Sequence, residues 1–485
     1  MKTNMIARGA APLLAALLLS ACAAPQFKQP AMEVPKAFKE SQTRAAVVTA
    51  TDGTKWQPAL QAERQPRGQW WLSFNDSALT ALIEEATKAN ANLAVAAARV
   101  KQARAIAGIA AADRIPQLGI NVGAQRGLGQ GTATGTTPSA ATTTYQANLT
   151  ASYEVDMFGR VSSNVNAARS DAAAVEANYR SVLLSLQADV AQTYFRLRST
   201  DAELETLQRT VDLRAESVAV NQRRYALGDI GEFDLARAKT ELAIARSEAI
   251  GLERQRATTE HALAVLLGKP AASFTAGATP LHDSSPMPAI PAGMPSSLLE
   301  RRPDIAAAQR TMEASNARIG VARAAMFPAL TISAAGGGAG GSFSDIFRWS
   351  SRSWMLGALM SVPLIDGGRN RNNITRSETA LEESVAGYRQ TVLIAFAEVE
   401  DNLAGLRVLS AQTKEVEDAL VSARRSADLA QKLYDAGRSS YLDLLDAQRN
   451  LASVQRSAVQ LRGNRAITTI ALIRALGGSW DSPAG

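Results

Sequence analysis

Two neighbouring carboxylates, Asp443 and Asp446, are the side chains of this 485-residue chain whose types and spacing best suit chemistry. The spacing i, i+4 and i+7 places Asp446 on one helical face with Leu442 and Arg449. A carboxylate pair could act as general acid and base, but this pair lies on a heptad-patterned helix without the signature of a pocket. Taken alone, these residues indicate a solvated charged face.

Other residue types that support catalysis are sparse. His261 and His282 are the only histidines, and neither has a Cys or His at ligand spacing. The sequence contains no phosphate-binding loop, nucleophile elbow or metal motif. The net charge of +7 comes from basic residues interspersed with Asp and Glu, which disfavours nucleic-acid binding. We therefore predict that the chain is not an enzyme and binds no metal, cofactor or nucleic acid.

The N-terminus carries a secretory signal. Lys2 and Arg8 precede the apolar run 13–19, which is too short to span a bilayer and leads into the lipobox Leu19-Ser20-Ala21-Cys22. Cys22 is the only cysteine, so acylation explains it better than a disulfide or a free thiol. The alternative is ordinary cleavage nearby, with Cys22 incidental. Because Ala23 and Ala24 stand where an Asp would retain a lipoprotein at the inner membrane, we expect a lipid-anchored protein of the outer membrane.

An internal duplication organises the rest of the chain. Residues 155–243 recur without gaps 209 positions later. Both copies share a helix-turn motif, formed by Tyr225, Gly228 and Asp234 in the first and by Tyr434, Gly437 and Asp443 in the second. The predicted segments are a signal peptide (1–21), a lipidated extended tether (22–70), a first repeat (71–270), a Pro-rich linker (271–297), a second repeat (298–478) and a C-terminal tail (479–485).

Each repeat contains a predicted hairpin. In the first copy, apolar and polar residues alternate along 118–122 and 145–156, as in a transmembrane strand with lipid on one face and water on the other. A surface hairpin on a soluble core has the same pattern and remains an alternative. The stretch 127–144 is rich in Gly, Thr and Ser, and we expect it to be an exposed loop.

The second copy repeats this arrangement less regularly. Its predicted strands and the Gly-rich loop between them are residues 330–334, 354–364 and 336–341. Trp354 occupies the position of Tyr145, which fits an interfacial aromatic girdle. Leu359 and Ile365 break the alternation here.

Long helices are predicted around each hairpin. A heptad spacing indicates coiled-coil packing: Val190, Leu197, Leu204, Val211 and Val218. At 1.5 Å per residue, the helices at 161–226 and 370–436 would each be roughly 100 Å long. We expect the shorter helices at 232–267 and 441–476 to stack end to end with the helices that precede the hairpins. The first of those is predicted as one capped helix, from Asn75-Asp76 to just before Pro116.

The predicted strands are too few for a membrane barrel. Four strands cannot close, whereas membrane barrels begin at eight strands and leave no edges. The chain must therefore oligomerise. Three copies would supply twelve strands and a wide lumen, and two copies eight strands and a nearly plugged lumen.

Several motifs, in this order, make the sequence resemble the TolC-type outer-membrane efflux factors, nearest their acylated, NodT-like branch. They are 71–76 (WLSFND), 153–160 (YEVDMFGR), 301–305 (RRPDI), 327–328 (FP) and 363–369 (PLIDGGR). The resemblance covers nearly all of the mature chain. It implies a mainly α fold with β, in which a homotrimer forms a 12-stranded β-barrel in the outer membrane continued by a 12-helix periplasmic α-barrel.

The resemblance also assigns roles to residues. Matching positions form the periplasmic gate, with Leu442 as an apolar plug, Asp443 and Asp446 as carboxylate rings, and Arg449 on the same face. In the first copy Asp446 has Arg237 as its counterpart, which could neutralise part of the ring. The turns containing Tyr225, Gly228, Tyr434 and Gly437 would contact a periplasmic adaptor protein.

The function expected from the resemblance is a passive exit duct for drugs or other small toxic compounds. The duct would work with a periplasmic adaptor and an inner-membrane efflux pump of RND type. Two alternatives remain at this point. One is an exit duct for type I protein secretion, and the other is a structural coiled-coil lipoprotein that tethers the outer membrane without forming a pore.

Overall fold

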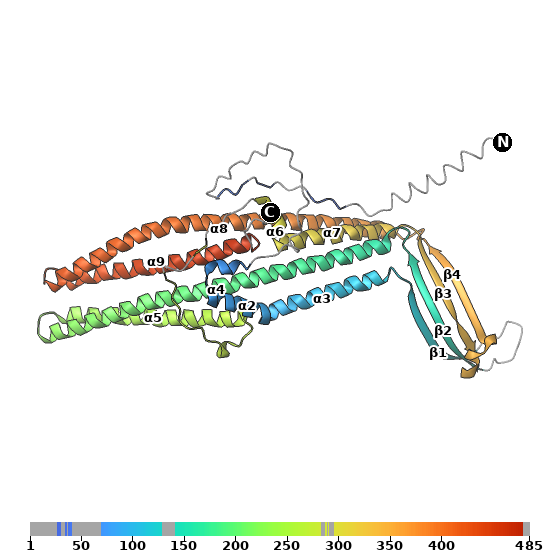
Figure 1. Cartoon of the computed structure of the whole chain (residues 1–485), viewed down its shortest axis with the longest axis horizontal. Helices are drawn as coiled ribbons and strands as arrows, with labels where there is room; N and C mark the ends of the chain where they lie inside the picture. Colours follow the sequence, from blue (N-terminus) through green and yellow to red (C-terminus); the bar gives the residue numbers. More distant parts are fainter. Residues whose placement is uncertain are drawn as a thin grey trace, which may run out of the picture. The chain divides into compact units, whose positions relative to one another are not determined.

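Figure 1 shows the chain as a computed structural model, which describes residues 27–30, 34–35, 37–40, 69–128, 141–282, 287–288, 290 and 295–478. The described residues form two compact units. The first includes residues 99–176 and 307–389, and the second includes residues 69–98, 177–306 and 390–478. The predicted signal peptide, Cys22 and the C-terminal tail lie outside the described residues, as do most of the tether and part of the Pro-rich linker.

The element order confirms the duplication. The first copy runs α3 (Ala91–Ala112), β1 (Gln117–Leu128), β2 (Ala141–Val155), α4 (Arg160–Ala226) and α5 (Glu232–Leu266). The second runs α7 (Pro303–Ala324), β3 (Ala329–Gly340), β4 (Arg352–Ser361), α8 (Arg369–Asp435) and α9 (Tyr441–Ala475). Corresponding helices have equal lengths of 22, 67 and 35 residues. No described helix is both long enough and apolar enough to cross a membrane.

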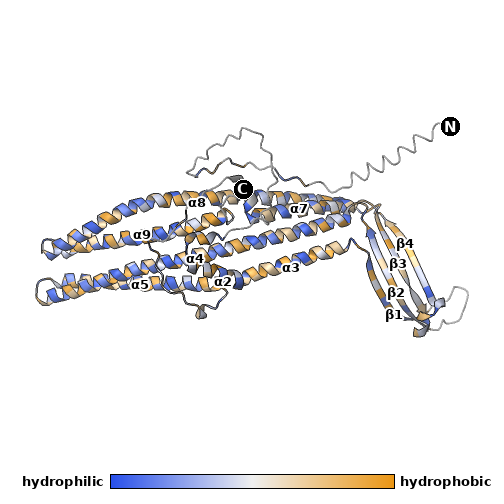
Figure 2. Cartoon of the chain, viewed as in Figure 1, coloured by the Kyte–Doolittle hydropathy of each residue, from blue (hydrophilic) through white to orange (hydrophobic). Residues whose placement is uncertain are grey.

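The four strands form one antiparallel sheet in the order β1-β2-β3-β4. The register places Ile120, Leu149, Gly336 and Trp354 side by side on one face, because directly paired residues share a face. Most large exposed apolar side chains of the strands lie on this face: Leu118, Ile120, Val122, Leu128, Leu149, Ile332, Trp354, Leu356 and Met360. Figure 2 shows hydrophobic and hydrophilic residues interspersed along the strands. The outer edges of β1 and β4 have no strand partner among the described residues.

The prediction of a Gly-rich loop at 336–341 is wrong for residues 336–340, which belong to β3. The connection is instead made by two short 3₁₀-helices, η4 (Phe343–Phe347) and η5 (Trp349–Ser351). The glycines are needed because η4 folds back against β3. A Cβ on Gly338 would overlap the carbonyl oxygen of Ile346, and one on Gly340 would overlap the Asp345 side chain. Close backbone approach, not turn formation, explains these glycines.

The bounds of the other three strands also differ from the predicted ones. The expected loop 127–144 is strand at both ends, since β1 reaches Leu128 and β2 begins at Ala141. The Thr-rich start of β2 pairs with the end of β1, so its β-branched residues favour the sheet. In the second copy β4 ends at Ser361, not at Leu364, because Pro363 cannot donate to a ladder.

The helix predicted from Asn75-Asp76 to before Pro116 is in fact two helices. These are α2 (Ser77–Ala89) and α3, and they are separated at Asn90, whose backbone is extended. The Asn90 side chain accepts a hydrogen bond from the Leu93 amide (3.0 Å) and donates one to the Leu266 carbonyl at the end of α5 (2.9 Å). Asn90 therefore caps α3 and lets α5 end against the α2–α3 junction, as the expected end-to-end stacking requires.

The second copy has an equivalent junction between α6 (Pro295–Arg301) and α7. Arg302 lies between these helices, is buried, and donates from Nη1 to the carbonyl oxygen of Ala475 near the end of α9 (3.1 Å). The same guanidinium pairs with Asp304 and Glu398, each at 2.6 Å. The RRPDI motif is thus a structural clamp on the ends of three helices.

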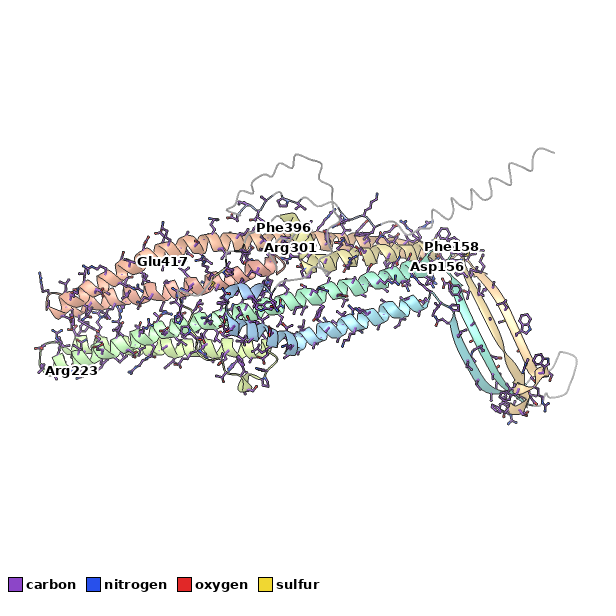
Figure 3. The ribbon with its side chains drawn as sticks, viewed as in Figure 1. Asp156, Phe158, Arg223, Arg301, Phe396 and Glu417 are labelled. Carbon is purple, nitrogen blue, oxygen red and sulfur yellow. The ribbon has the colours of Figure 1, made fainter. Side chains whose placement is uncertain are left out.

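Other family motifs also have structural roles. In the first unit, Asp156 accepts hydrogen bonds from the Val161 and Ser162 amides and so caps α4. Phe158, labelled with Asp156 in Figure 3, stacks on Phe327 of the second copy with ring centroids 4.9 Å apart. These contacts join the two repeats at the point where strands give way to helices.

The second unit holds the main apolar core and a docked N-terminal segment. Its core combines Trp70, Trp71, Phe74 and Phe195 with residues of α9. Phe38 is buried against Leu298, Val399, Leu472 and Leu476. The next two backbone amides, of Lys39 and Glu40, donate to the Glu400 carboxylate at 2.7 and 3.0 Å.

Candidate functional site

The two helix-ending turns have the same backbone geometry. Gly228 and Gly437 have φ of +80° and +70°, and each amide donates to the carbonyl of the tyrosine three residues earlier at 3.0 Å. Glycine adopts this left-handed conformation without steric penalty. Both predicted turns are therefore conventional helix C-caps.

The tyrosines of the two turns differ in environment. Tyr225 is exposed, as are Leu227 and Phe233 nearby. Tyr434 is buried, its hydroxyl donates to Asn221 Oδ1 at 3.1 Å, and the Arg224 guanidinium lies over its ring at 5.0 Å. Within one chain, Tyr434 thus links α8 to α4, whereas Tyr225 is available at the surface.

Asp443 is part of the cap of α9. Its carboxylate accepts hydrogen bonds from the hydroxyls of Ser440 (2.8 Å) and Ser439 (2.9 Å), and its amide donates to Ser440 Oγ (3.2 Å). The bond from Ser440 is the main reason that the pKa of Asp443 is lowered. In the first copy the cap of α5 is Gly231, which offers no side chain, so Asp234 lacks this arrangement. The second-copy aspartate stabilises the helix start.

Leu442 and Asp446 lie on the exposed side of α9. The Asp446 side chain is 62% exposed and has one described ion pair, with Arg449 at 3.6 Å. Leu442 is also exposed. Both side chains are therefore open to contact with other copies.

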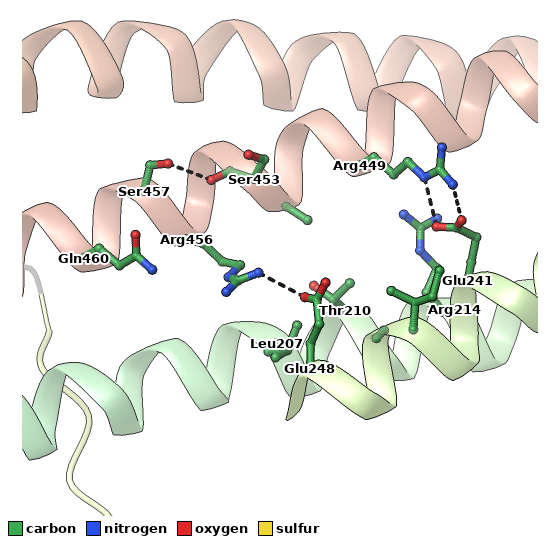
Figure 4. Close-up of a pocket in the computed structure, with 13 residues that line it drawn as sticks. Leu207, Thr210, Arg214, Glu241, Glu248, Arg449, Ser453, Arg456, Ser457 and Gln460 are labelled. Carbon is green, nitrogen blue, oxygen red and sulfur yellow. Dashed lines mark hydrogen bonds and ion pairs between the residues drawn. The ribbon is translucent and has the colours of Figure 1, made fainter. Parts of the chain in front are cut away.

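Arg449 is exposed but is paired within the protomer. Its Nε donates to Glu241 Oε2 at 2.9 Å and its Nη2 donates to Glu241 Oε1, so a bidentate ion pair joins α9 to α5 (Figure 4). Glu241 is 8% exposed. The hydrogen bond from Arg449 is the main cause of the lowered pKa of Glu241, and the same bond raises the pKa of Arg449.

A second ion pair follows seven residues further along both helices. Arg456 contacts Glu248 Oε2 of α5 and Glu203 Oε1 of α4, each at 3.0 Å. Both α5–α9 pairs join residues 208 positions apart, so they fix one register between the helices. They line a cleft of about 430 Å³ between α4, α5 and α9 (Figure 4).

Arg214 is the least satisfied charge of this cleft. It is 4% exposed, and its Nη1 donates to Gln448 Oε1 at 2.6 Å. Burial lowers the pKa of Arg214, although the field of Glu241 opposes that effect. A neighbouring contact joins Ser217 Oγ and the Tyr441 hydroxyl at 3.1 Å. α9 is thus attached to α4 as well as to α5.

Arg237 lies beside Phe233 on α5. Its guanidinium lies over the Phe233 ring at 5.8 Å, and its charge helps to lower the pKa of Glu241. Its predicted neutralisation of the Asp446 ring stays a prediction.

Sequence reasoning missed the partners of Arg449. The missed cleft residues are Arg214, Glu241, Glu248 and Arg456, and Glu203 beside Arg456 was missed as well. A signal was available, because Glu241 and Glu248 on one predicted helix match Arg449 and Arg456 on the other at the same seven-residue spacing.

Comparisons with known proteins agree with this architecture. The family model "Outer membrane efflux protein" matches residues 82–269 and 294–478. Escherichia coli "Cation efflux system protein CusC" is 33% identical over 97% of this chain and 98% of its own length. Pseudomonas putida "Toluene efflux pump outer membrane protein TtgI" is 33% identical over the same shares.

Solved structures give the same result. A crystal structure of CusC aligns with a TM-score of 0.82 and 30% identity, covering 94% of this chain and 99% of that one. The outer membrane protein VceC of Vibrio cholerae aligns with a TM-score of 0.78 and 29% identity, covering 86% and 100%. Both repeats and nearly the whole length of these relatives are matched, so the chain belongs to the outer membrane efflux protein family.

Proposed function

We propose that this chain is the lipid-anchored exit duct of a tripartite efflux system and acts as a homotrimer. The observation that carries the proposal is the sheet, which has an exposed apolar face and two unpaired edges. Three such sheets, paired edge to edge, would satisfy the edges and turn the apolar faces to lipid. Each repeat continues from its hairpin into a helix of 67 residues, which supplies the periplasmic wall.

The contacts between the helix pairs suit a gate. Tyr434 joins α8 to α4, and Arg449, Arg456 and Tyr441 join α9 to α5 and α4. Widening a duct at this end by moving α8 and α9 away from α4 and α5 requires these bonds to break. Leu442 and Asp446, exposed on α9, would then form the ring between protomers.

The proposed partners are a periplasmic adaptor, contacting the exposed Tyr225 side of the turns, and an inner-membrane pump of RND type. Cys22 carries the proposed lipid, and the duct itself performs no catalysis and needs no cofactor. The proposed cargo is drugs or other small toxic compounds. CusC is named for cation efflux and TtgI for toluene efflux, so relatives of equal identity serve different cargoes.

The test is single-channel conductance of the purified, lipidated protein in planar bilayers. We expect small openings for the wild type and roughly tenfold more open time for Arg449→Gln, because a charge-assisted bidentate pair contributes about 1.5–3 kcal/mol. Leu442→Ala/Asp446→Ala should also open the channel. Asp428→Asn, an exposed carboxylate on α8, is the matched control and should behave as wild type.

Folded wild-type protein without any conductance would contradict the duct. Conductance that is unchanged in Arg449→Gln and in Leu442→Ala/Asp446→Ala would leave the duct standing and contradict the gate.

A further inference from the structure

The hairpin end of the sheet gathers exposed aromatic side chains. Trp349 and Trp354 are 81% and 84% exposed, and Phe343 and Phe347 beside them are exposed too. The loop that carries three of them folds onto the apolar face, where Phe343 meets Tyr145 edge to face at 6.5 Å. Ile346 of the same loop lies against Gly338. This cluster, residues 343–354 with Tyr145, is called the aromatic loop below.

The negative and positive side chains of the strands lie at opposite ends of the sheet. Glu154, the one carboxylate on the described strands, lies at the helix end and pairs with Arg160. Arg126 and Arg352, the two strand arginines, lie at the hairpin end and on the apolar face. Arg348 adds a third cation there and has Asp345 beside it at 3.1 Å. The net charge at the hairpin end is therefore positive.

Arg352 stands at a cleft of about 430 Å³ in this face. The cleft is lined by Ala147, Gly338, Ile346, Phe347, Arg352 and Trp354. The Arg352 guanidinium lies 4.2 Å from the centre of the Trp349 ring, so its N–H donors remain available around its rim. The Arg352 guanidinium beside an apolar cleft suits a ligand that has both a phosphate and an acyl chain.

We propose that the aromatic loop binds a phosphorylated glycolipid of the outer leaflet. Arg352 and Arg348 contact its phosphate, and its acyl chain lies in the cleft against Trp354 and Gly338. The inference rests on the proposed function for orientation, since the helices leave the opposite end of the sheet toward the periplasm. Tryptophan and arginine at the level of the headgroups are the side chains expected for such a contact.

The experiment uses the full-length protein in phosphatidylcholine nanodiscs that contain diphosphoryl lipid A, with bound lipid counted by native mass spectrometry. We expect wild type to retain lipid A and Arg348→Gln/Arg352→Gln to retain it about thirtyfold less, because the variant removes two basic residues that each contribute about 1 kcal/mol near an anionic lipid. Arg104→Gln/Arg323→Gln removes two exposed charges from helices α3 and α7 and should bind as wild type.

A second pair of variants tests the cleft without changing charge. Gly338→Ala places a methyl group against Ile346 and should displace the aromatic loop and weaken binding, whereas Gly336→Ala has open space and should not. Dephosphorylated lipid A should bind poorly. Inorganic phosphate should not compete, because it lacks the acyl chain.

The proposal is overturned if dephosphorylated lipid A binds equally well, or if both arginine pairs reduce binding equally. Competition by inorganic phosphate would show a simple anion site and would also overturn it. Conductance of the same samples distinguishes failure of the lipid site from failure of the proposed duct. A protein that conducts but does not bind lipid A supports the duct and contradicts the lipid site. A wild type that does not conduct removes the duct itself.

Discussion

Glu241 is the residue whose ionisation best reports the contact between α5 and α9. Its pKa lies below the usual 4.5, so the ionised form is favoured in the folded protein. A depressed carboxyl pKa contributes stability that is present above the unfolded pKa and is lost as pH falls through the folded value. The α5–α9 contact should therefore hold at neutral and mildly acidic pH and weaken only below the usual carboxyl range.

Conductance measured against pH checks this prediction. Wild type should open more as pH falls below about 4, the ordinary glutamate range, and Glu241→Gln should be leaky already at neutral pH without the added acid response. Glu253→Gln, on the exposed side of α5, is the control. Equal acid responses in wild type and Glu241→Gln would count against the role of Glu241.

Unlike the loss of Glu241, the replacement of Arg214 should stabilise the folded protein. Its lowered pKa shows that burial disfavours its charge by more than the field of Glu241 favours it. Removing a buried charge that has only an uncharged hydrogen-bond partner also removes the cost of its desolvation. Arg214→Leu should therefore raise the melting temperature, although it also removes the bond to Gln448. A melting temperature below that of wild type would disprove this assignment.

Replacing Asp443 and replacing Asp446 should change the stability of the protein by different amounts. Asp443→Ala removes an N-terminal cap interaction and should lower the free energy of unfolding. Asp446→Ala removes only an exposed pair at 3.6 Å, which contributes little. Thermal unfolding followed by circular dichroism compares the two. Equal melting temperatures would show that the Asp443 carboxylate does not stabilise the start of α9.

For single residues, the sequence could place the predicted gate residues on one helical face but could not identify the residues that they contact. Leu442, Asp446 and Arg449 share α9 as the spacing predicts. The partner of Arg449 is 208 residues away, and only the tertiary register brings Glu241 to it. Local periodicity carries no information on such pairs.

Among the elements, the break between helices α2 and α3 at Asn90 could not be predicted from the spacing of apolar residues. Apolar residues continue at helical spacing across it, with Leu79, Ile83, Ala86 and Leu93 all buried. The backbone turns because Asn90 bonds to both Leu93 and Leu266. A side chain that competes with the helix in this way is visible only when its partners are known.

Asn90→Ala should lower the free energy of unfolding by roughly 1–2 kcal/mol, since it removes a cap and leaves the Leu266 carbonyl without this donor. Asn92→Ala, an exposed neighbour on α3, should have little effect. Urea unfolding curves of the two variants give the comparison. Identical midpoints would mean that the junction does not depend on Asn90.

For the whole molecule, the repeat and the alternation of the first hairpin were enough to predict an internally duplicated chain with four strands and two long helix pairs. The element lengths confirm this, as does the family match. The glycine run of β3 was misassigned because glycine usually indicates a turn. For Gly338 and Gly340 the cause is the approach of η4, a contact between segments that only the folded chain brings together.

The docked Phe38 segment has a consequence for the order of events during biogenesis. Its partner Glu400 is 361 residues further along the chain, and Leu472 is later still. At about 5–20 residues per second, the Phe38 segment waits on the order of 20–70 s for Glu400 to be synthesised. This segment, although it is made before its binding site, can dock only among the last steps of folding. A newly translocated chain must therefore be shielded from proteases and from self-association until its final helix arrives.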